Sequence, residues 1–357
     1  LANNLAYNFN GYSGPNPSVG VVVVKNEEVI SIGNTGLSGR PHAEINALKK
    51  LSINEKKNST IYISLEPCSH YGRTPPCVNK IIKSNIKRVV YSSNDIDPRT
   101  FTMAPSSLKE AIDKITDSGE LCPKCVIPVD LFGIPANYWE IQAIARCNDL
   151  FVIEDAAQSF GAASGGVPAG GFGDVAGVSF FPSKPLGAYG DAGMILTGDD
   201  HLAGRLRSVR LQGKGLGKNE NVRVGLNSRM DTIQAAVLLA KLTVFSKELM
   251  SRRQVAQRYT EGLRDVVVTP IEPEGVDSAW SQYSILVQDR ETFRRVLWDN
   301  GISTKIYYPT PLHLQKSFSK LGYEKGDFQV AEDVAERVVS LPIHGYLTNT
   351  TVDRVVD

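Results

Sequence analysis

One imidazole, two thiols and one carboxylate within residues 42–77 have the types and order that a hydrolytic zinc site needs. His42 is followed two residues later by Glu44, and Cys68 and Cys77 come further along the chain. Zn²⁺ in catalytic sites takes three protein ligands and keeps a fourth position for a water molecule, whose pKa it lowers to about 7. A neighbouring carboxylate can then relay protons. These residue types predict a hydrolytic zinc site with His42, Cys68 and Cys77 as ligands and Glu44 as the general acid and base.

A second pair of chemically capable residues lies in the middle of the chain. Asp155 ends the apolar run 151–155, which we expect to form a buried strand, and Lys184 follows a glycine-rich stretch. Pyridoxal phosphate needs a lysine for its Schiff base and an acid that keeps its pyridinium nitrogen protonated. A single Asp or Lys is more often a surface charge, so the residues around this pair decide between the two interpretations.

Alternating strands and helices are predicted around the zinc-binding residues. His42 begins one predicted helix, and Cys68 lies between a strand and the next helix, where the positive end of the helix dipole favours thiolate. The order β-β-α-β-α-β implies a mostly buried sheet flanked by helices. The predicted elements are strands 19–25, 29–32, 60–65 and 86–91 and helices 42–51 and 78–84.

The length, composition and net charge of the chain are those of a globular protein. At 357 residues the chain should hold two domains of roughly 150 residues each. Its apolar fraction of 42%, charged fraction of 22% and net charge of +1 give no reason to expect a nucleic-acid partner. No apolar run reaches the roughly 18 residues of a membrane span, and the N-terminus lacks signal-peptide features. With five cysteines, two of them in the zinc site, we expect a reduced, cytoplasmic protein.

The first part of the chain, residues 1–98, resembles the deaminase domain of the bifunctional riboflavin-biosynthesis deaminase/reductase. The resemblance rests on residues 15–20, 39–44 and 66–77. Eight residues separate Cys68 from Cys77, whereas nucleic-acid-editing deaminases usually have Cys-x-x-Cys. The resemblance implies a cytidine-deaminase-like α/β/α module. It would deaminate a phosphorylated diaminopyrimidine ribosylamino intermediate of riboflavin biosynthesis by zinc-dependent hydrolysis.

The resemblance also implies roles for single residues of this part. His42, Cys68 and Cys77 would bind Zn²⁺, and Glu44 would relay protons. The substrate contacts would come from Asn16, His70 and Arg73. One departure is Thr35, where many members of that family carry a substrate-contacting histidine.

Residues 95–357 resemble the DegT-type sugar-nucleotide aminotransferases without roughly the first hundred residues of that family. The matching segments are 155–161, 179–184, 227–231, 307–309 and 341–344. The resemblance implies a truncated pyridoxal-phosphate enzyme of fold type I, an α/β fold with the remainder of the large domain and a small α+β C-terminal domain. Its substrates would be glutamate and a keto nucleotide sugar of the 3-oxo-glucuronate type, and it would be a homodimer.

This resemblance implies that Lys184 forms the Schiff base and that Asp155 holds the pyridinium nitrogen. Gln158 would pack near the ring, and Ser179 would hold the cofactor phosphate. Asn227 would reach into the site of the neighbouring subunit, where Arg229 and His313 would contact the sugar nucleotide. A Gly-Thr turn for the phosphate and an aromatic residue that stacks on the ring, which that family carries in its first hundred residues, are not recognisable here.

Because the two resemblances meet near residues 95–99, we interpret the chain as a chimera. The predicted domains are a zinc deaminase-like domain at 1–98, a partial aminotransferase large domain at 99–245 and a small C-terminal domain at 246–357. The leading prediction is zinc-dependent deamination. The alternatives are pyridoxal-phosphate-dependent transamination by the C-terminal part and a catalytically silent fusion that dimerises.

Two predicted elements leave open questions of packing. The helix 106–115 and the strand 126–129 can complete the first sheet through a right-handed crossover or stay in the second sheet.

The helix 230–242 is amphipathic, and we expect Ile233, Val237 and Leu238 to face the core.

Overall fold

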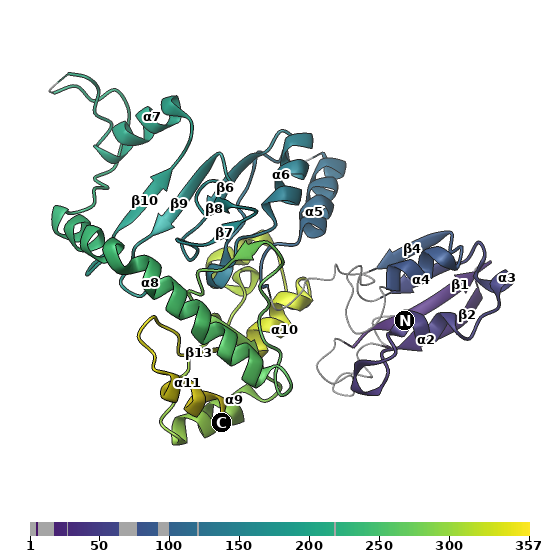
Figure 1. The fold of residues 1–357 in the computed structure, drawn as a ribbon. Coiled ribbons are helices and arrows are strands. Elements are labelled where there is room, and N and C mark those ends of the chain that lie inside the picture. The colour runs from purple at the N-terminus through teal and green to yellow at the C-terminus, as the bar shows by residue number, and fades with distance from the viewer. Residues whose placement is uncertain are drawn as a thin grey trace. The chain divides into compact units, whose positions relative to one another are not determined.

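The computed structural model describes residues 18–26, 28–63, 77–91, 100–119, 121–217 and 219–357, together with Leu5. The chain divides into two separate units, Leu1–Asp95 and Ile96–Asp357 (Figure 1). This boundary lies where the two resemblances meet. The further division of the second unit at residue 245 stays a prediction.

Unit 1 contains a four-stranded sheet whose order is β2-β1-β3-β4. Strand β1 is antiparallel to β2 and β3, and β3 is parallel to β4. Val21 and Val23 of β1 are buried and share a core with apolar residues of β3, α2 and α4. The elements are β1 Gly20–Lys25, β2 Glu28–Asn34, η1 Leu37–Gly39, α2 Ala43–Leu48, α3 Ile53–Lys56, β3 Thr60–Ile63, α4 Cys77–Lys83 and β4 Arg88–Tyr91. For the described residues this is the predicted β-β-α-β-α-β order with two short helical elements, η1 and α3, added.

Strand β2 passes so close to α2 that residue 33 must be glycine. A Cβ atom at Gly33 would lie 2.4 Å from the carbonyl oxygen of Ala43 and 2.6 Å from the amide nitrogen of Ala47. Close-packed interiors leave no room for such an overlap. This contact fixes α2 against the sheet, and with it His42, which caps the helix, and Glu44 in its first turn.

The larger sheet of unit 2 has the order β10-β9-β6-β5. Strands β5 (Cys125–Val126), β6 (Phe151–Asp155) and β9 (Val175–Ser179) are parallel, and β10 (Gly193–Leu196) is antiparallel to β9. Val126 pairs with Val152, and Val129 forms a further bridge to Asp155. The predicted strand 126–129 thus belongs to this sheet, and the alternative that it completes the first sheet is wrong.

Helices α5 (Pro105–Ser118) and α6 (Tyr138–Cys147) share a core with β5 and β6. Tyr138 stacks on Phe172 with 4.6 Å between the ring centroids. The predicted helix 106–115 is confirmed as α5. The remaining elements before the long helix α8 are η2 Leu131–Gly133, β7 Ala163–Ser164, β8 Val167–Pro168 and α7 Asp200–Arg210.

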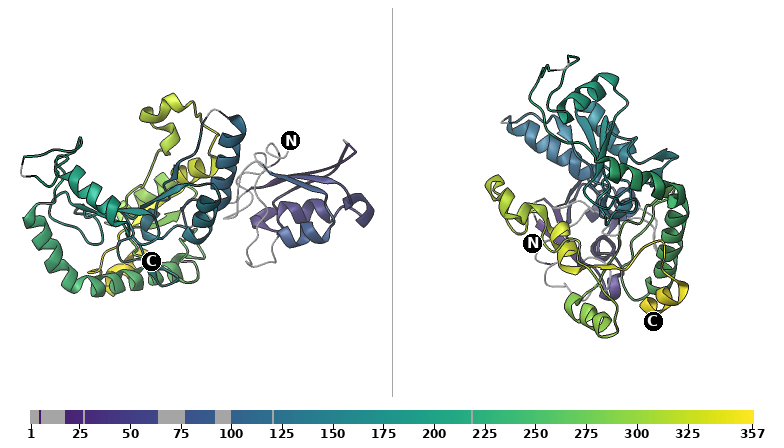
Figure 2. Two further views of the ribbon diagram at one scale, coloured as in Figure 1. Left: turned by 90° about the horizontal axis from the view of Figure 1, so that it is seen from above. Right: turned by 90° about the vertical axis from the view of Figure 1, so that its left-hand side faces the viewer.

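Helix α8 (Thr232–Leu263) joins the larger sheet to the C-terminal part (Figure 2). Its first half packs on the core beneath β9 through Leu238 and Phe245. Its second half shares a core with the antiparallel pair β12–β13 and with α11. The elements of this part are β11 Val276–Asp277, β12 Tyr283–Leu286, α9 Arg290–Asp299, η3 Leu312–Leu314, η4 Lys316–Leu321, α10 Gln329–Arg337, β13 Val338–Leu341 and α11 Asn349–Val356.

One predicted core position of α8 is wrong. Leu238 is buried as expected, but the side chain of Ile233 is 75% exposed. At 100° per residue, Ile233 lies about 140° around the helix from Leu238, whereas Phe245 falls almost on the same face as Leu238. The core of the sheet therefore receives Leu238 and Phe245, and Ile233 faces away from it. Among the described helices, α8 included, none is long and apolar enough to cross a membrane.

Candidate functional site

Asp155 and Ser179 lie at the same edge of the larger sheet. Each is the last residue of its strand, β6 and β9, and the two strands are parallel neighbours with Asp155 opposite Gly177. Ligands of open α/β sheets bind outside the carboxyl ends of the strands. The sheet therefore places these two predicted cofactor-binding residues where a ligand is expected.

Lys184 follows β9 in a turn closed by a hydrogen bond from its backbone amide to the carbonyl of Phe181, 2.9 Å long. Its side chain is half-buried. Burial lowers the pKa of the Lys184 amine, and the nearby negative charge of Asp155 opposes this shift without cancelling it. A lysine with a lowered pKa has more of its amine in the neutral, nucleophilic form near neutral pH. The predicted pair of Lys184 and Asp155 is thus close enough to interact electrostatically.

Gln158 links the sheet edge to a segment distant in the sequence. Its buried side chain accepts a hydrogen bond from the amide of Phe132 at 2.6 Å, and its Nε2 donates to the hydroxyl of Tyr308 at 3.4 Å. Asp155 accepts a hydrogen bond from the amide of Ala157 at 3.1 Å. The segments 155–158 and 307–309, both singled out in the sequence, therefore meet at this edge.

The residues at this edge fit pyridoxal phosphate. Asp155 offers a carboxylate to a ring nitrogen, and Lys184 offers a half-buried amine with a lowered pKa beside it. The hydroxyl of Ser179 accepts a hydrogen bond from the amide of Phe181 at 3.3 Å, so its own proton remains for an anion such as a phosphate. The individual roles of Gln158 and Ser179 stay predictions.

Asn227 and Arg229 lie on the surface before α8. Both side chains are exposed, and Nε of Arg229 donates to Oδ1 of Asn227 over 3.2 Å. Exposed polar groups at this place are compatible with a role in a neighbouring subunit. That role stays a prediction.

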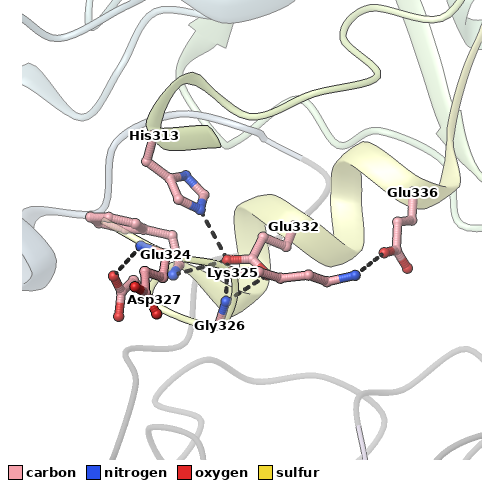
Figure 3. A network of polar contacts seen from close by, with 8 residues as sticks. His313, Glu324, Lys325, Gly326, Asp327, Glu332 and Glu336 are labelled. Atoms are coloured by element: carbon pink, nitrogen blue, oxygen red, sulfur yellow. Dashed lines mark hydrogen bonds and ion pairs between the residues drawn. The ribbon is translucent and has the colours of Figure 1, made fainter. Parts of the chain in front are cut away.

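His313 is buried in a polar network near the start of α10 (Figure 3). Its side chain is 8% exposed, and its Nε2 lies 3.0 Å from Oε1 of Glu332. Glu332 also accepts hydrogen bonds from the amides of Gly326 and Phe328, at 2.8 Å and 3.3 Å. Burial alone raises the pKa of Glu332, but these hydrogen bonds and that of His313 outweigh it, and the pKa is lowered. One ring nitrogen of His313 is thus already engaged.

Nothing in the sequence indicates that Glu332 belongs to this network. An acidic residue in the first turn of a helix is common because it favours the helix dipole, and this position alone gives no sign of a buried network. The predicted role of His313 in binding the sugar nucleotide stays a prediction.

In unit 1, His42, Glu44 and Cys77 come together. Their potential ligand atoms all lie within 4.8 Å of one another, and Sγ of Cys77 is 3.3 Å from Nδ1 of His42. Glu44 and Cys77 are buried. Because α2 begins after His42 and α4 begins at Cys77, two helix N-termini bring these groups together. Four further predicted site residues lie outside the described residues, namely Asn16, Cys68, His70 and Arg73.

Comparison with known proteins shows two family matches. The model of the DegT/DnrJ/EryC1/StrS aminotransferase family matches residues 77–357, and the cytidine and deoxycytidylate deaminase zinc-binding region matches residues 1–93. The first match covers most of the chain. The chain belongs to the DegT/DnrJ/EryC1/StrS aminotransferase family.

Relatives and solved structures agree with this membership. The chain is 41% identical over 259 residues to the UDP-2-acetamido-2-deoxy-3-oxo-D-glucuronate aminotransferase of Pseudomonas aeruginosa, covering 72% of this chain and 69% of the relative. A DegT DnrJ EryC1 StrS aminotransferase from Brucella abortus superposes with a TM-score of 0.71 at 42% identity, covering 82% of this chain and 77% of that one. NtdA from Bacillus subtilis, solved with bound cofactor PMP, superposes with a TM-score of 0.64 at 28% identity, covering 82% and 65%.

These findings correct the leading functional prediction. Zinc-dependent deamination of a riboflavin-pathway pyrimidine is wrong as the function of this chain, because the relatives that match most of it are sugar aminotransferases. The deaminase resemblance is supported only by the match to residues 1–93. The predicted fold, a pyridoxal-phosphate fold-type-I aminotransferase preceded by a deaminase-like module, is confirmed.

Proposed function

We propose that this protein transfers an amino group to a keto nucleotide sugar with pyridoxal phosphate as cofactor. The observation that carries the proposal is the carboxyl edge of a parallel sheet, where Asp155 and Ser179 end neighbouring strands and the half-buried Lys184 follows five residues after Ser179. Family membership supports the cofactor. The name of the Pseudomonas relative supports a sugar of the 3-oxo-glucuronate type as the acceptor, and glutamate is the amino donor that the resemblance implies.

The residues at the sheet edge divide the chemistry between them. Bound pyridoxal phosphate would supply an electron sink for the bond electrons released at the substrate carbon. The carboxylate of Asp155 would keep the proton on the ring nitrogen, and the amine of Lys184 would carry the proton between substrate and cofactor carbons. Ser179 would donate a hydrogen bond to the phosphate, and Gln158 would pack near the cofactor ring.

A second copy of the chain would complete the substrate site. Asn227 and Arg229 are exposed and hold each other at 3.2 Å, and Val224 and Leu226 just before them are 96% and 65% exposed. Apolar side chains exposed beside polar groups are typical of an interface. In the homodimer, Asn227 would reach into the site of the other subunit, and Arg229 and His313 would contact the nucleotide sugar there.

The reaction itself tests the proposal. Purified protein with pyridoxal phosphate, L-glutamate and a UDP-linked 3-oxo-glucuronate is expected to release 2-oxoglutarate and form the amino sugar, both measured by mass spectrometry. The same mixture with D-glutamate is the control, because its α-hydrogen would face away from a fixed Lys184. Folded protein that binds the cofactor and gives no 2-oxoglutarate would contradict the proposal.

For unit 1 we propose metal binding alone, with His42, Cys68 and Cys77 as zinc ligands. The clustering of His42, Glu44 and Cys77 within 4.8 Å supports it.

Protein purified without chelators is expected to carry about one zinc per chain. Cys77→Ala is expected to lose most of the metal, because two remaining ligands hold zinc far more weakly than three. Metal analysis of Cys147→Ala, which removes an exposed thiol, is the matched control. Zinc-free wild-type protein, or equal zinc in both variants, would refute the assignment.

A further inference from the structure

Asp130 is a fully buried carboxyl group that the proposed chemistry does not use. It lies just beyond β5 and receives three hydrogen bonds. Oδ1 accepts from the amide of Ala136 at 3.0 Å and from the hydroxyl of Tyr138 at 2.8 Å, and Oδ2 accepts from the hydroxyl of Ser159 at 2.6 Å. One side chain thus joins the segment 130–138 to the segment that follows β6.

The backbone of the same residue is tied to Asp155. The amide of Asp130 donates to the carbonyl of Asp155 at 3.1 Å, and the amide of Asp155 donates to the carbonyl of Pro128 at 3.0 Å. The segment 155–159 is therefore held at its start by these backbone bonds and at its end by the hydrogen bond from Ser159 to Asp130.

The turn closed by Asp130 presents a donor to Gln158. Phe132 has a φ of +62°, a left-handed conformation that is unfavourable for a phenylalanine, and its amide donates to Gln158 at 2.6 Å. Gly133 follows with a φ of +100°, and a Cβ there would lie 2.8 Å from the amide nitrogen of Ser281. Because Asp130 also holds Ala136 and Tyr138, its carboxyl group fixes both ends of this turn.

We propose that Asp130 is a positioning residue, which holds the turn 130–136 and the segment 155–159 together and so places Gln158 and Asp155 at the cofactor ring. The proposal rests on the proposed function. It assigns Asp130 no contact with cofactor or substrate. Its task is to keep the carboxylate of Asp155 and the side chain of Gln158 in fixed positions, which a preorganised site requires.

The environment of Asp130 gives the test a second readout. Burial raises its pKa to about 7, and the charge of Glu154 in β6 adds to the shift, against the hydrogen bonds from Ser159, Ala136 and Tyr138 of α6. The folded state therefore keeps a proton that the unfolded chain, with a pKa near 3.9, has lost. This contribution to stability is complete below about pH 4 and is lost as the pH rises through 7.

Asp130→Ala and Asp130→Asn test the proposal together. Alanine leaves three buried donors without an acceptor, and we expect pyridoxal phosphate to bind at least about tenfold more weakly and kcat to fall with little change in KM for the nucleotide sugar. Asparagine can accept from Ala136 and Tyr138 and donate to Ser159, and it is expected to restore most of the cofactor affinity. Its urea midpoint is expected to vary less between pH 5 and 8 than that of the wild type.

Asp149→Asn, on the surface between α6 and β6, is the matched control. If Asp130→Ala does not fold, Ser159→Ala, which removes one of the three donors, is expected to weaken cofactor binding about threefold. Folded Asp130→Ala with wild-type cofactor affinity would overturn the proposal, as would unchanged affinity in Ser159→Ala when Asp130→Ala fails to fold. A wild-type protein that binds no cofactor would instead overturn the proposed function.

Discussion

Lys184→Ala is expected to lower the rate of 2-oxoglutarate release at least about 1,000-fold. The substitution removes both the amine that would attach the cofactor to the protein and the group that would carry the proton, and a positioned acid or base alone contributes roughly 100- to 10,000-fold. Its lowered pKa makes this amine the appropriate one for both tasks. The assay is the release of 2-oxoglutarate, combined with the visible absorbance of the protein-bound cofactor, which is expected to be lost.

Lys247→Ala is the matched control, because Lys247 is exposed on α8 and its loss removes the same charge. Added methylamine is expected to restore part of the activity of Lys184→Ala, since a small amine can occupy the space left by the side chain. Activity of Lys184→Ala within tenfold of the wild type would contradict the assignment of Lys184.

Glu154→Ala is expected to destabilise unit 2 by about 3–5 kcal/mol. Glu154 is fully buried, and its carboxylate accepts hydrogen bonds from the amides of Gly170, Phe172 and Gly173. Removing the carboxylate leaves three donors unpaired, the buried amide of Phe172 and the part-buried amides of Gly170 and Gly173. An unpaired buried donor costs roughly 1–3 kcal/mol, and water that reaches the part-buried amides offsets part of the loss. Urea unfolding followed by circular dichroism measures the change.

Two further variants make the measurement specific. Glu154→Gln keeps one carbonyl oxygen and is expected to lose about half as much stability. Glu274→Ala, which removes an exposed carboxylate, is expected to stay within about 0.5 kcal/mol of the wild type. A urea midpoint of Glu154→Ala equal to that of the wild type would show that these hydrogen bonds contribute nothing net.

Local patterns were sufficient to predict most elements of both units. The valine run of β1 and the run ending in Asp155 have the composition of buried strands, and both are strands in the structure. The position of Asp155 at the sheet edge follows from its place at the end of such a run. The strand 126–129 could not be assigned from its sequence, because a short apolar strand carries no information about which neighbour it pairs with.

The leading functional prediction was wrong because a short zinc-binding motif describes only the part of the chain that carries it, whereas the aminotransferase resemblance extends over most of the residues. His42, Glu44 and Cys77 do come together, yet they lie in a unit that makes up a minor part of the chain. Asp130 and Glu332 were missed for another reason. Each is buried by partners distant in the sequence, Ser159 for Asp130 and His313 for Glu332, and no local pattern distinguishes such a carboxylate from an exposed one.

Each described sheet draws its strands from one side of residue 95 alone. Among the described strands, none that precedes residue 95 is hydrogen-bonded to one that follows it. A genetic exchange that joins two coding sequences near residues 95–99 would therefore leave the hydrogen bonds within each described sheet intact. Among the described strands, the register of each set is fixed by partner strands from its own part of the chain.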